Sequence, residues 1–264
     1  MQIEHHFSGN TSYYAAGRGK TVLLLHGWLH SGRIWENLYP FSKPEVRYIA
    51  VDLPGFGKTP PLRQSDATIN NLSKWAFHFI KSLPDEHKPD YIIADSLGAV
   101  IMLQAFSEYT LSIKKLVLLG CPVDGLPSHL RLAQKLLPVH TLLRGLQALP
   151  ENVLEKLIKY GNLVTMKKRN VKLSSLIYSI YAVDPGFAAK ILTQIQKPVS
   201  SLPHIAIPEF ILRGEFDRIV SRKSSHKLAA SLRASYFEIQ DSGHTPMLEQ
   251  PESLMHILNK TFEL

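Results

Sequence analysis

The strongest constraint on the fold is one serine between a predicted strand and a predicted helix. Residues 91–94 form an apolar run typical of a buried strand, and a helical pattern covers residues 97–108. Ser96 lies between them, with Ala94 two positions before it and Gly98 two positions after it. Small residues at both positions allow a tight turn that lifts the serine hydroxyl clear of the sheet, above the helix N-terminus. The pattern predicts a nucleophile elbow, in which Ala replaces the first glycine of G-x-S-x-G.

The rest of the chain alternates predicted strands with predicted helices. Strands are predicted at residues 3–7, 12–15, 20–25, 46–51, 113–119, 207–212 and 235–239. Helices are predicted at residues 33–41, 69–83, 221–232 and 251–262. This alternation indicates an α/β fold with a mostly parallel sheet and helices on both of its faces.

Residues 122–200 interrupt the alternation because they contain no convincing strand. Four helices are predicted there, at residues 130–137, 141–149, 152–160 and 172–182. We therefore expect a core domain made of residues 1–121 and 201–264, with residues 122–200 inserted as a helical lid over the carboxyl edge of the sheet.

A serine hydroxyl needs a base within hydrogen-bond reach, and the base needs an orienting acid. His244 is the best candidate for the base, because it follows the last predicted strand on a loop that reaches the same sheet edge as Ser96. The acid is expected after the preceding strand, where Asp217 is the first choice and Glu215 the rival.

A tetrahedral intermediate also needs hydrogen-bond donors for its oxyanion, and the loss of one donor costs about a hundredfold in rate or more. One expected donor is the backbone N–H of Leu97, directly after the serine. The second is expected in the loop after residue 25, where we choose the N–H of Trp28. Trp28, Leu97 and His244 are therefore the expected substrate-binding residues. His26, in the same loop, is expected to brace it by hydrogen bonding.

Five sequence motifs, spread over nearly the whole chain, carry a family resemblance. They are His26-Gly27-Trp28 with Trp35, Asp52-Leu-Pro-Gly-Phe-Gly-Lys-Thr59, Ala94-Asp-Ser-Leu-Gly98, Gly214-Glu-Phe-Asp217 and Gly243-His244. With them the chain resembles lid-bearing α/β-hydrolases, and most of all the pimeloyl-acyl-carrier-protein methyl ester esterases and similar carboxylesterases. The order Ser96, Asp217, His244 is the order of that fold, which favours Asp217 over Glu215.

The resemblance implies a serine hydrolase that cleaves carboxylic esters of short to medium acyl chains through an acyl-enzyme, with no cofactor and no metal. Alternatives within the fold are a pimeloyl-acyl-carrier-protein methyl ester esterase, a lactonase or a carbon–carbon bond hydrolase. An alternative of another class is a non-catalytic hydrolase-fold protein that binds a partner.

Asp95 is the rival nucleophile at the elbow. Epoxide hydrolases and haloalkane dehalogenases of this fold use an Asp at the elbow. If Asp95 were the nucleophile, Ile93 and Leu97 would occupy the positions that must be small, so we reject that alternative. Cys121 follows a predicted core strand and is expected to be a buried, inert thiol.

The net charge of +8 is concentrated in one segment. Residues 122–200 hold eleven Lys and Arg residues against four acidic ones, and so carry +7 of it. These charges either form solvated helix faces or attract an acidic partner such as an acyl carrier protein. Nucleic-acid binding is not expected, because the basic residues are scattered and no binding motif accompanies them.

Composition sets the remaining expectations. The single cysteine rules out an intrachain disulfide. The N-terminal residues lack the apolar core of a secretory signal, and no apolar run is long enough to span a bilayer. We therefore expect a soluble, cytoplasmic protein.

Overall fold

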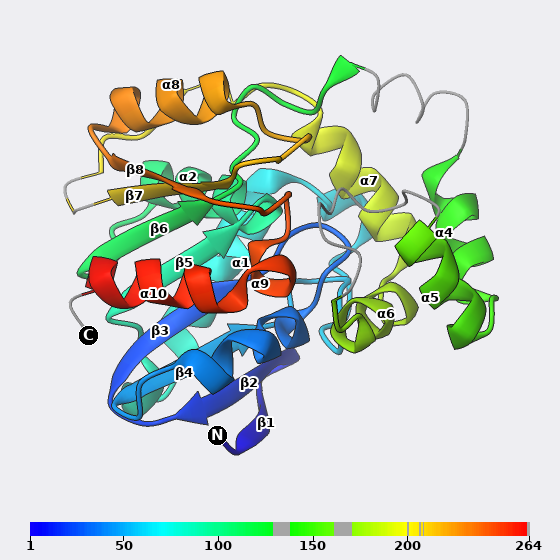
Figure 1. The fold of residues 1–264 in the computed structure, drawn as a ribbon, viewed down its shortest axis with the longest axis horizontal. Coiled ribbons are helices and arrows are strands. Elements are labelled where there is room, and N and C mark those ends of the chain that lie inside the picture. The colour runs from blue at the N-terminus through cyan, green and yellow to red at the C-terminus, as the bar shows by residue number, and fades with distance from the viewer. Residues whose placement is uncertain (129–137, 161–170, 200, 206, 208, 263–264) are drawn as a thin grey trace.

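The computed structural model describes the chain except residues 129–137, 161–170, 200, 206, 208 and 263–264. Its eight strands form one sheet (Figure 1). They are β1 (Ile3–Ser8), β2 (Thr11–Gly17), β3 (Lys20–Leu25), β4 (Val46–Val51), β5 (Tyr91–Asp95), β6 (Lys115–Leu119), β7 (Glu209–Gly214) and β8 (Ser235–Ile239). The described α-helices are α1 (Ile69–Ser82), α2 (Leu97–Glu108), α4 (Val139–Gln147), α5 (Glu151–Tyr160), α6 (Ser174–Tyr181), α7 (Pro185–Ile195), α8 (Arg222–Leu232), α9 (Pro246–Glu249) and α10 (Pro251–Phe262). Short 3-10 helices are η1 (Gly32–Phe41), η2 (Gln64–Asp66) and η3 (Asp85–His87).

The sheet has the strand order β1-β2-β4-β3-β5-β6-β7-β8. The hairpin β1–β2 is antiparallel, and β2 also pairs antiparallel with β4, whereas every other pair is parallel. The predicted α/β-hydrolase fold, with its mostly parallel sheet, is therefore confirmed. Because β3, β5, β6, β7 and β8 run in one direction, the loops that follow them meet at one edge of the sheet.

Both faces of the sheet are covered by helices, which is why the central strands are apolar throughout. Side chains of β3 alternate between two clusters: Leu23 and Leu25 pack with residues of α1, α2 and α8, and Val22 and Leu24 pack with residues of η1 and α10. Trp35, on η1, is completely buried.

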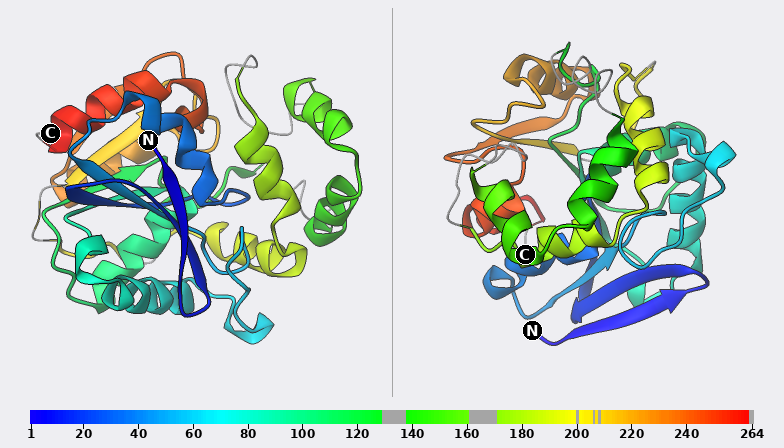
Figure 2. Two further views of the ribbon diagram at one scale, coloured as in Figure 1. Left: turned by 90° about the horizontal axis from the view of Figure 1, so that it is seen from below. Right: turned by 90° about the vertical axis from the view of Figure 1, so that its right-hand side faces the viewer.

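Helices α4 to α7 lie together on one side of the sheet-and-helix body (Figures 1 and 2). They come from the segment between β6 and β7, and no strand occurs in its described residues. Helix α6 contacts η1, and α7 contacts η2. The helix predicted at residues 130–137 lies outside the described residues.

Helix α7 was missed by the sequence analysis, in which the last helix predicted for residues 122–200 ends at residue 182, before Asp184-Pro185-Gly186. The structure begins a helix there: Asp184 is its N-cap, and its Oδ1 accepts a hydrogen bond of 2.7 Å from the N–H of Phe187. Pro185 occupies the first turn, where a missing N–H costs nothing. The helix predicted at residues 33–41 is a 3-10 helix and not an α-helix, with Pro40 near its end.

None of the helices among the described residues is long and apolar enough to cross a membrane.

Candidate active site

Ser96 lies at a sharp turn between β5 and α2. Its backbone angles, φ 49° and ψ −107°, are ones that residues with a side chain rarely adopt. The turn is held by a hydrogen bond of 2.8 Å from the Ser96 N–H to the carbonyl of Leu119 on β6. A Cβ on Gly98 would lie only 2.9 Å from the Cβ of Leu25, so a small residue is required there. This is the tight strand–turn–helix geometry predicted from the sequence.

His244 reaches Ser96 from the loop after β8. Its Nε2 lies 3.1 Å from Ser96 Oγ, and its Nδ1 lies 2.8 Å from Asp217 Oδ2. A neutral imidazole with its proton on Nδ1 satisfies both contacts, because Nδ1–H then donates to Asp217 and Nε2 accepts from the serine. Gly120, after β6, makes room for the ring, since a Cβ there would lie 3.0 Å from His244 Cε1. The structure thus brings together the three residues that sequence analysis selected.

Asp217 is buried and fully hydrogen-bonded. While Oδ2 accepts from His244, Oδ1 accepts from the N–H groups of Ile219 at 2.8 Å and Val220 at 3.0 Å. Burial alone would raise the pKa of Asp217, but His244 and the two amides hold this pKa below its ordinary value. Asp217 is therefore set up as an ionised partner for the imidazole.

The rival acid, Glu215, takes a different position. Its Oε2 accepts a hydrogen bond of 3.0 Å from the N–H of Asp241. The structure therefore brings Asp217, and not Glu215, to the His244 ring.

The pKa of His244 is raised to about 9. Burial alone would lower it, but the charge and the hydrogen bond of Asp217 outweigh burial, and the carboxylates of Asp95 and Glu249 add to the effect. The site therefore stabilises the imidazolium, which is the form His244 takes after it accepts a proton.

Glu249 is a site residue that sequence analysis missed. This carboxylate is buried on α9 and accepts hydrogen bonds from the N–H of Gly243, at 3.0 and 3.1 Å, and from the hydroxyl of Thr245, at 3.1 Å. It therefore fixes the backbone on both sides of His244. The available signal was an acidic residue in the short apolar run Pro246–Glu249, five positions after the histidine.

The loop after β3 lies against the nucleophile. A Cβ on Gly27 would lie 3.1 Å from Ser96 Cβ, so the loop backbone passes directly beside the serine. His26 braces this loop as predicted: Nε2 accepts from the N–H of Leu53 at 3.0 Å, and Nδ1 therefore donates to the Gly27 carbonyl at 2.8 Å. Burial lowers the pKa of His26 to about 3, which keeps the ring neutral.

Of the two predicted oxyanion donors, Leu97 directly follows the serine in the chain, and Trp28 directly follows Gly27, which lies beside the serine. Leu97 is the first residue of α2, so its N–H has no acceptor within the helix. Trp28 follows Gly27, and its indole Nε1 donates a hydrogen bond of 2.9 Å to the carbonyl of Ala188 on α7. The Trp28 side chain thus links the loop beside the serine to the 122–200 segment.

A second acid–histidine pair lies near the serine, against Gly27. Asp95 is completely buried, and its Oδ2 is 3.5 Å from Nδ1 of buried His30. Within the described part of the chain, neither carboxylate oxygen has a hydrogen-bond partner. Cys121 is buried near this pair, and burial, with the charge of Asp95, raises the pKa of its thiol.

Among the residues that the structure describes, no group of three or more His, Cys, Asp or Glu side chains is arranged to hold a metal ion.

Comparison with known proteins agrees with this architecture. The model of the Alpha/beta hydrolase family matches residues 22–256. The chain is 24% identical over 260 residues to a pimeloyl-[acyl-carrier protein] methyl ester esterase of Vibrio vulnificus, which covers 95% of this chain and 97% of that one. Among solved structures, an epoxide hydrolase, CorEH, superposes with a TM-score of 0.75 at 18% identity, covering 99% of both chains. An esterase of Exiguobacterium antarcticum superposes with a TM-score of 0.73 at 19% identity, covering 96% of both.

Proposed function

We propose that this chain, which belongs to the α/β hydrolase family, is a serine hydrolase that cleaves carboxylic esters. The observation that carries the proposal is the unbroken hydrogen-bond chain from Ser96 through His244 to Asp217, at 3.1 and 2.8 Å. It begins at a serine on a strained turn, which is the arrangement that activates a hydroxyl as a nucleophile.

The reaction proceeds in two halves. Ser96 Oγ attacks the ester carbonyl while His244 Nε2 takes its proton, and the backbone N–H groups of Trp28 and Leu97 stabilise the oxyanion. The intermediate collapses, the bond to the alcohol breaks, and the alcohol leaves with the proton from His244. A water molecule then gives a proton to His244 and attacks the acyl-enzyme, which releases the acid and restores Ser96. Asp217 keeps the imidazole in the required tautomer throughout.

We further propose that residues 122–200 form a lid over this site and favour acyl chains of short to medium length. The hydrogen bond from Trp28 to Ala188 supports this placement, since it joins the segment to the loop beside the serine.

The direct test is hydrolysis of a p-nitrophenyl ester series, from acetate to laurate, by the wild type and by Ser96→Ala. The wild type is expected to turn over at least one ester, with a chain-length optimum, and the variant to lose about 10⁴-fold or more in kcat. Equal turnover by both proteins would refute the nucleophile assignment. Absence of turnover on every ester would favour a lactone, a carbon–carbon bond substrate, or a non-catalytic binding protein.

A methyl ester carried by an acyl carrier protein is the second candidate substrate. It is supported by the similarity to the Vibrio esterase and by the positive charge of residues 122–200. On α4 and α5, the cations Arg144 and Lys156 and the apolar side chains of Leu142 and Leu157 are exposed, a composition suited to an acidic protein.

Charge reversal separates the two candidates. Arg144→Glu with Lys156→Glu is expected to raise KM at least tenfold for a carrier-linked ester, while the same change leaves p-nitrophenyl ester hydrolysis unaltered. Lys74→Glu, at an exposed position on α1, is the matched control. Equal losses on both substrates would indicate damage to the segment and count against carrier binding.

A further inference from the structure

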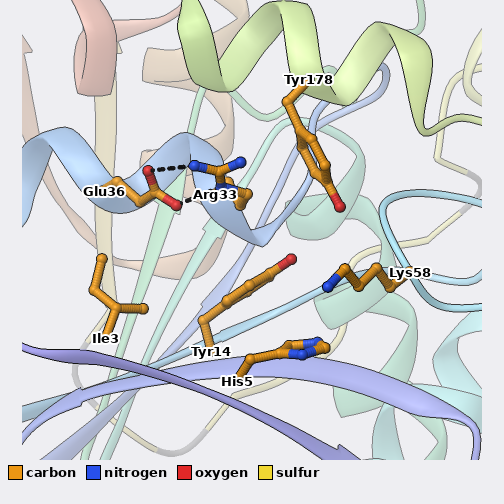
Figure 3. Close-up of a pocket in the computed structure, with 7 residues that line it drawn as sticks. All are labelled: Ile3, His5, Tyr14, Arg33, Glu36, Lys58 and Tyr178. Atoms are coloured by element: carbon orange, nitrogen blue, oxygen red, sulfur yellow. Dashed lines mark hydrogen bonds and ion pairs between the residues drawn. The ribbon is translucent and has the colours of Figure 1, made fainter.

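A cavity of about 360 Å³ is lined by residues other than the serine and its partners. Its walls come from β1 and β2, from η1, from the loop after β4 and from α6 (Figure 3). None of its lining residues belongs to the Ser96–His244–Asp217 chain. This volume is within the range of small-molecule sites.

Hydrogen-bond donors dominate the polar surface of this cavity. The side chains of Lys58, Tyr14 and Tyr178 point toward one another across it (Figure 3). Within the described part of the chain, no acidic side chain pairs with the Lys58 ammonium group. The one carboxylate in the lining, Glu36, is held by two hydrogen bonds from Arg33, at 2.6 and 3.3 Å. The carboxylate of Glu36 is therefore already hydrogen-bonded, whereas donor groups of the cavity are still available to a ligand.

The oxygens of Asp52, an acid close to the cavity residue Lys58, are also hydrogen-bonded already. Asp52 is buried, and it accepts from the N–H of Gly32 at 2.7 Å, the Ser12 hydroxyl at 2.8 Å and the N–H of Lys58 at 2.9 Å. Because the Ser12 hydroxyl donates to Asp52, it accepts from His5 Nε2 at 2.9 Å. The charge of Asp52 offsets that of Lys58 locally, but its oxygens are not free to receive a donor from a ligand.

Tyr14 gives an independent sign that a partner is missing. Its side chain is buried and its hydroxyl is cut off from bulk solvent; this hydroxyl lies close to that of Tyr178, without a well-aligned hydrogen bond to it or to any other described residue. Burial and the nearby Asp52 and Tyr178 raise the pKa of Tyr14, so the hydroxyl stays protonated and can donate. A buried donor without an acceptor costs free energy, which a ligand could recover.

The walls beside these donors are flat and partly apolar. The ring of His5 lies 5.0 Å from that of Tyr14, tilted by 31°. The guanidinium group of Arg33 lies over the ring of Tyr178, 4.8 Å from its centroid. Ile3 closes one side (Figure 3). A planar body is therefore a better match to these walls than a fully hydrated inorganic ion.

We propose that this cavity is a second binding site for a small organic carboxylate with a flat apolar body. The carboxylate lies against the Lys58 ammonium and the hydroxyls of Tyr14 and Tyr178, and the apolar body lies against the Tyr14 ring and Ile3. Because Tyr178 is on α6 and Tyr14 is on β2, a bound molecule bridges the 122–200 segment and the sheet.

The test is isothermal titration of the full chain with benzoate, compared with benzamide, which has the same shape and no charge. Benzoate is expected to bind at least tenfold more tightly than benzamide. Lys58→Met, which removes an exposed charge and keeps the length of the side chain, is expected to weaken benzoate binding at least tenfold, and Tyr178→Phe several-fold. Lys74→Met is the matched control and should leave the affinity unchanged.

A carboxylate is also a product of the proposed reaction, so its location must be established. His244→Ala is expected to leave benzoate binding intact. Binding that is lost in His244→Ala and kept in Lys58→Met would place benzoate beside Ser96 and overturn the proposal. Equal affinity for benzoate and benzamide, or no binding at any concentration at which the chain stays folded, would overturn it as well. These outcomes are independent of whether the chain hydrolyses esters.

Discussion

Two acid–histidine pairs lie within the same buried region, and their surroundings differ sharply. In the Asp217–His244 pair, Oδ2 and Nδ1 are 2.8 Å apart. Two backbone N–H groups donate to the other carboxylate oxygen, and the second ring nitrogen lies within hydrogen-bond distance of the Ser96 hydroxyl. In the Asp95–His30 pair the atoms are 3.5 Å apart, and the carboxylate has no hydrogen bond within the described residues. An aspartate and a histidine therefore occur once within a continuous hydrogen-bond chain and once in a longer contact whose carboxylate has no hydrogen bond within the described residues.

Both carboxylates are buried, so burial does not distinguish the pairs, whereas backbone hydrogen bonds to the carboxylate do. The N–H groups of Ile219 and Val220 support the ionised form of Asp217, which in turn holds the tautomer of His244. Asp95 has no such support from backbone donors within the described residues. Its charge contributes to the raised pKa of His244.

The largest expected effect comes from neutralising the ordered pair. Asp217→Asn keeps the size of the side chain, but an amide neither stabilises the imidazolium nor fixes its tautomer, so kcat on a p-nitrophenyl ester should fall by about 10⁴-fold. Asp95→Asn, the matched change in the other pair, should reduce kcat by less than tenfold. Similar losses in both variants would remove the distinction drawn between the pairs.

Removing the support of the His244 loop should have an intermediate effect. Glu249→Ala deletes the acceptor for the Gly243 N–H and the Thr245 hydroxyl, and a displacement of the ring by about 1 Å should cost roughly a hundredfold in kcat. Glu249→Gln keeps one acceptor oxygen and should lose much less. If Glu249→Ala retained full activity with an unchanged circular dichroism spectrum, the positioning role would be wrong.

The pH profile tests the raised pKa of His244. The imidazole must be neutral to accept the Ser96 proton, so kcat/KM should fall as pH drops through its pKa, and this limb should lie above the ordinary histidine value of about 6.5. Asp95→Asn removes a charge that favours the imidazolium, and should move the limb to lower pH. Asp90→Asn, which alters an acid paired with exposed Lys114, is the control and should not move it. A limb at the same pH in Asp95→Asn and the wild type would contradict the electrostatic role of Asp95.

The smallest expected effect is on stability. Asp95→Asn replaces a buried carboxyl group that lacks hydrogen bonds to the described residues by an amide of the same size, which is less costly to bury, so the free energy of unfolding should not fall and should rise by at most about 1 kcal/mol. Urea denaturation followed by circular dichroism measures this change. A fall in stability would mean that Asp95 has interactions that its contacts with the described residues do not reveal.

The parts of the site that could be predicted from sequence depend on strand order and local sterics. Ser96 was identifiable because its turn needs small residues on both sides, and His244 and Asp217 because loops after parallel strands meet at one edge. Glu249, His30 and the cavity around Lys58 were not identifiable, because they depend on how side chains from distant elements approach one another. Helix α7 was missed for another reason, since Asp-Pro-Gly can end one helix or begin the next.

The hydrogen bond from the Trp28 indole to the Ala188 carbonyl couples the position of α7 to that of the loop beside Ser96. If α7 moves outward by more than the reach of that bond, either the bond breaks or Trp28 travels with the helix, and the backbone next to the serine is disturbed. A bulky molecule would then enter while α7 is displaced, and the backbone beside Ser96 would regain its reactive geometry only after α7 returns.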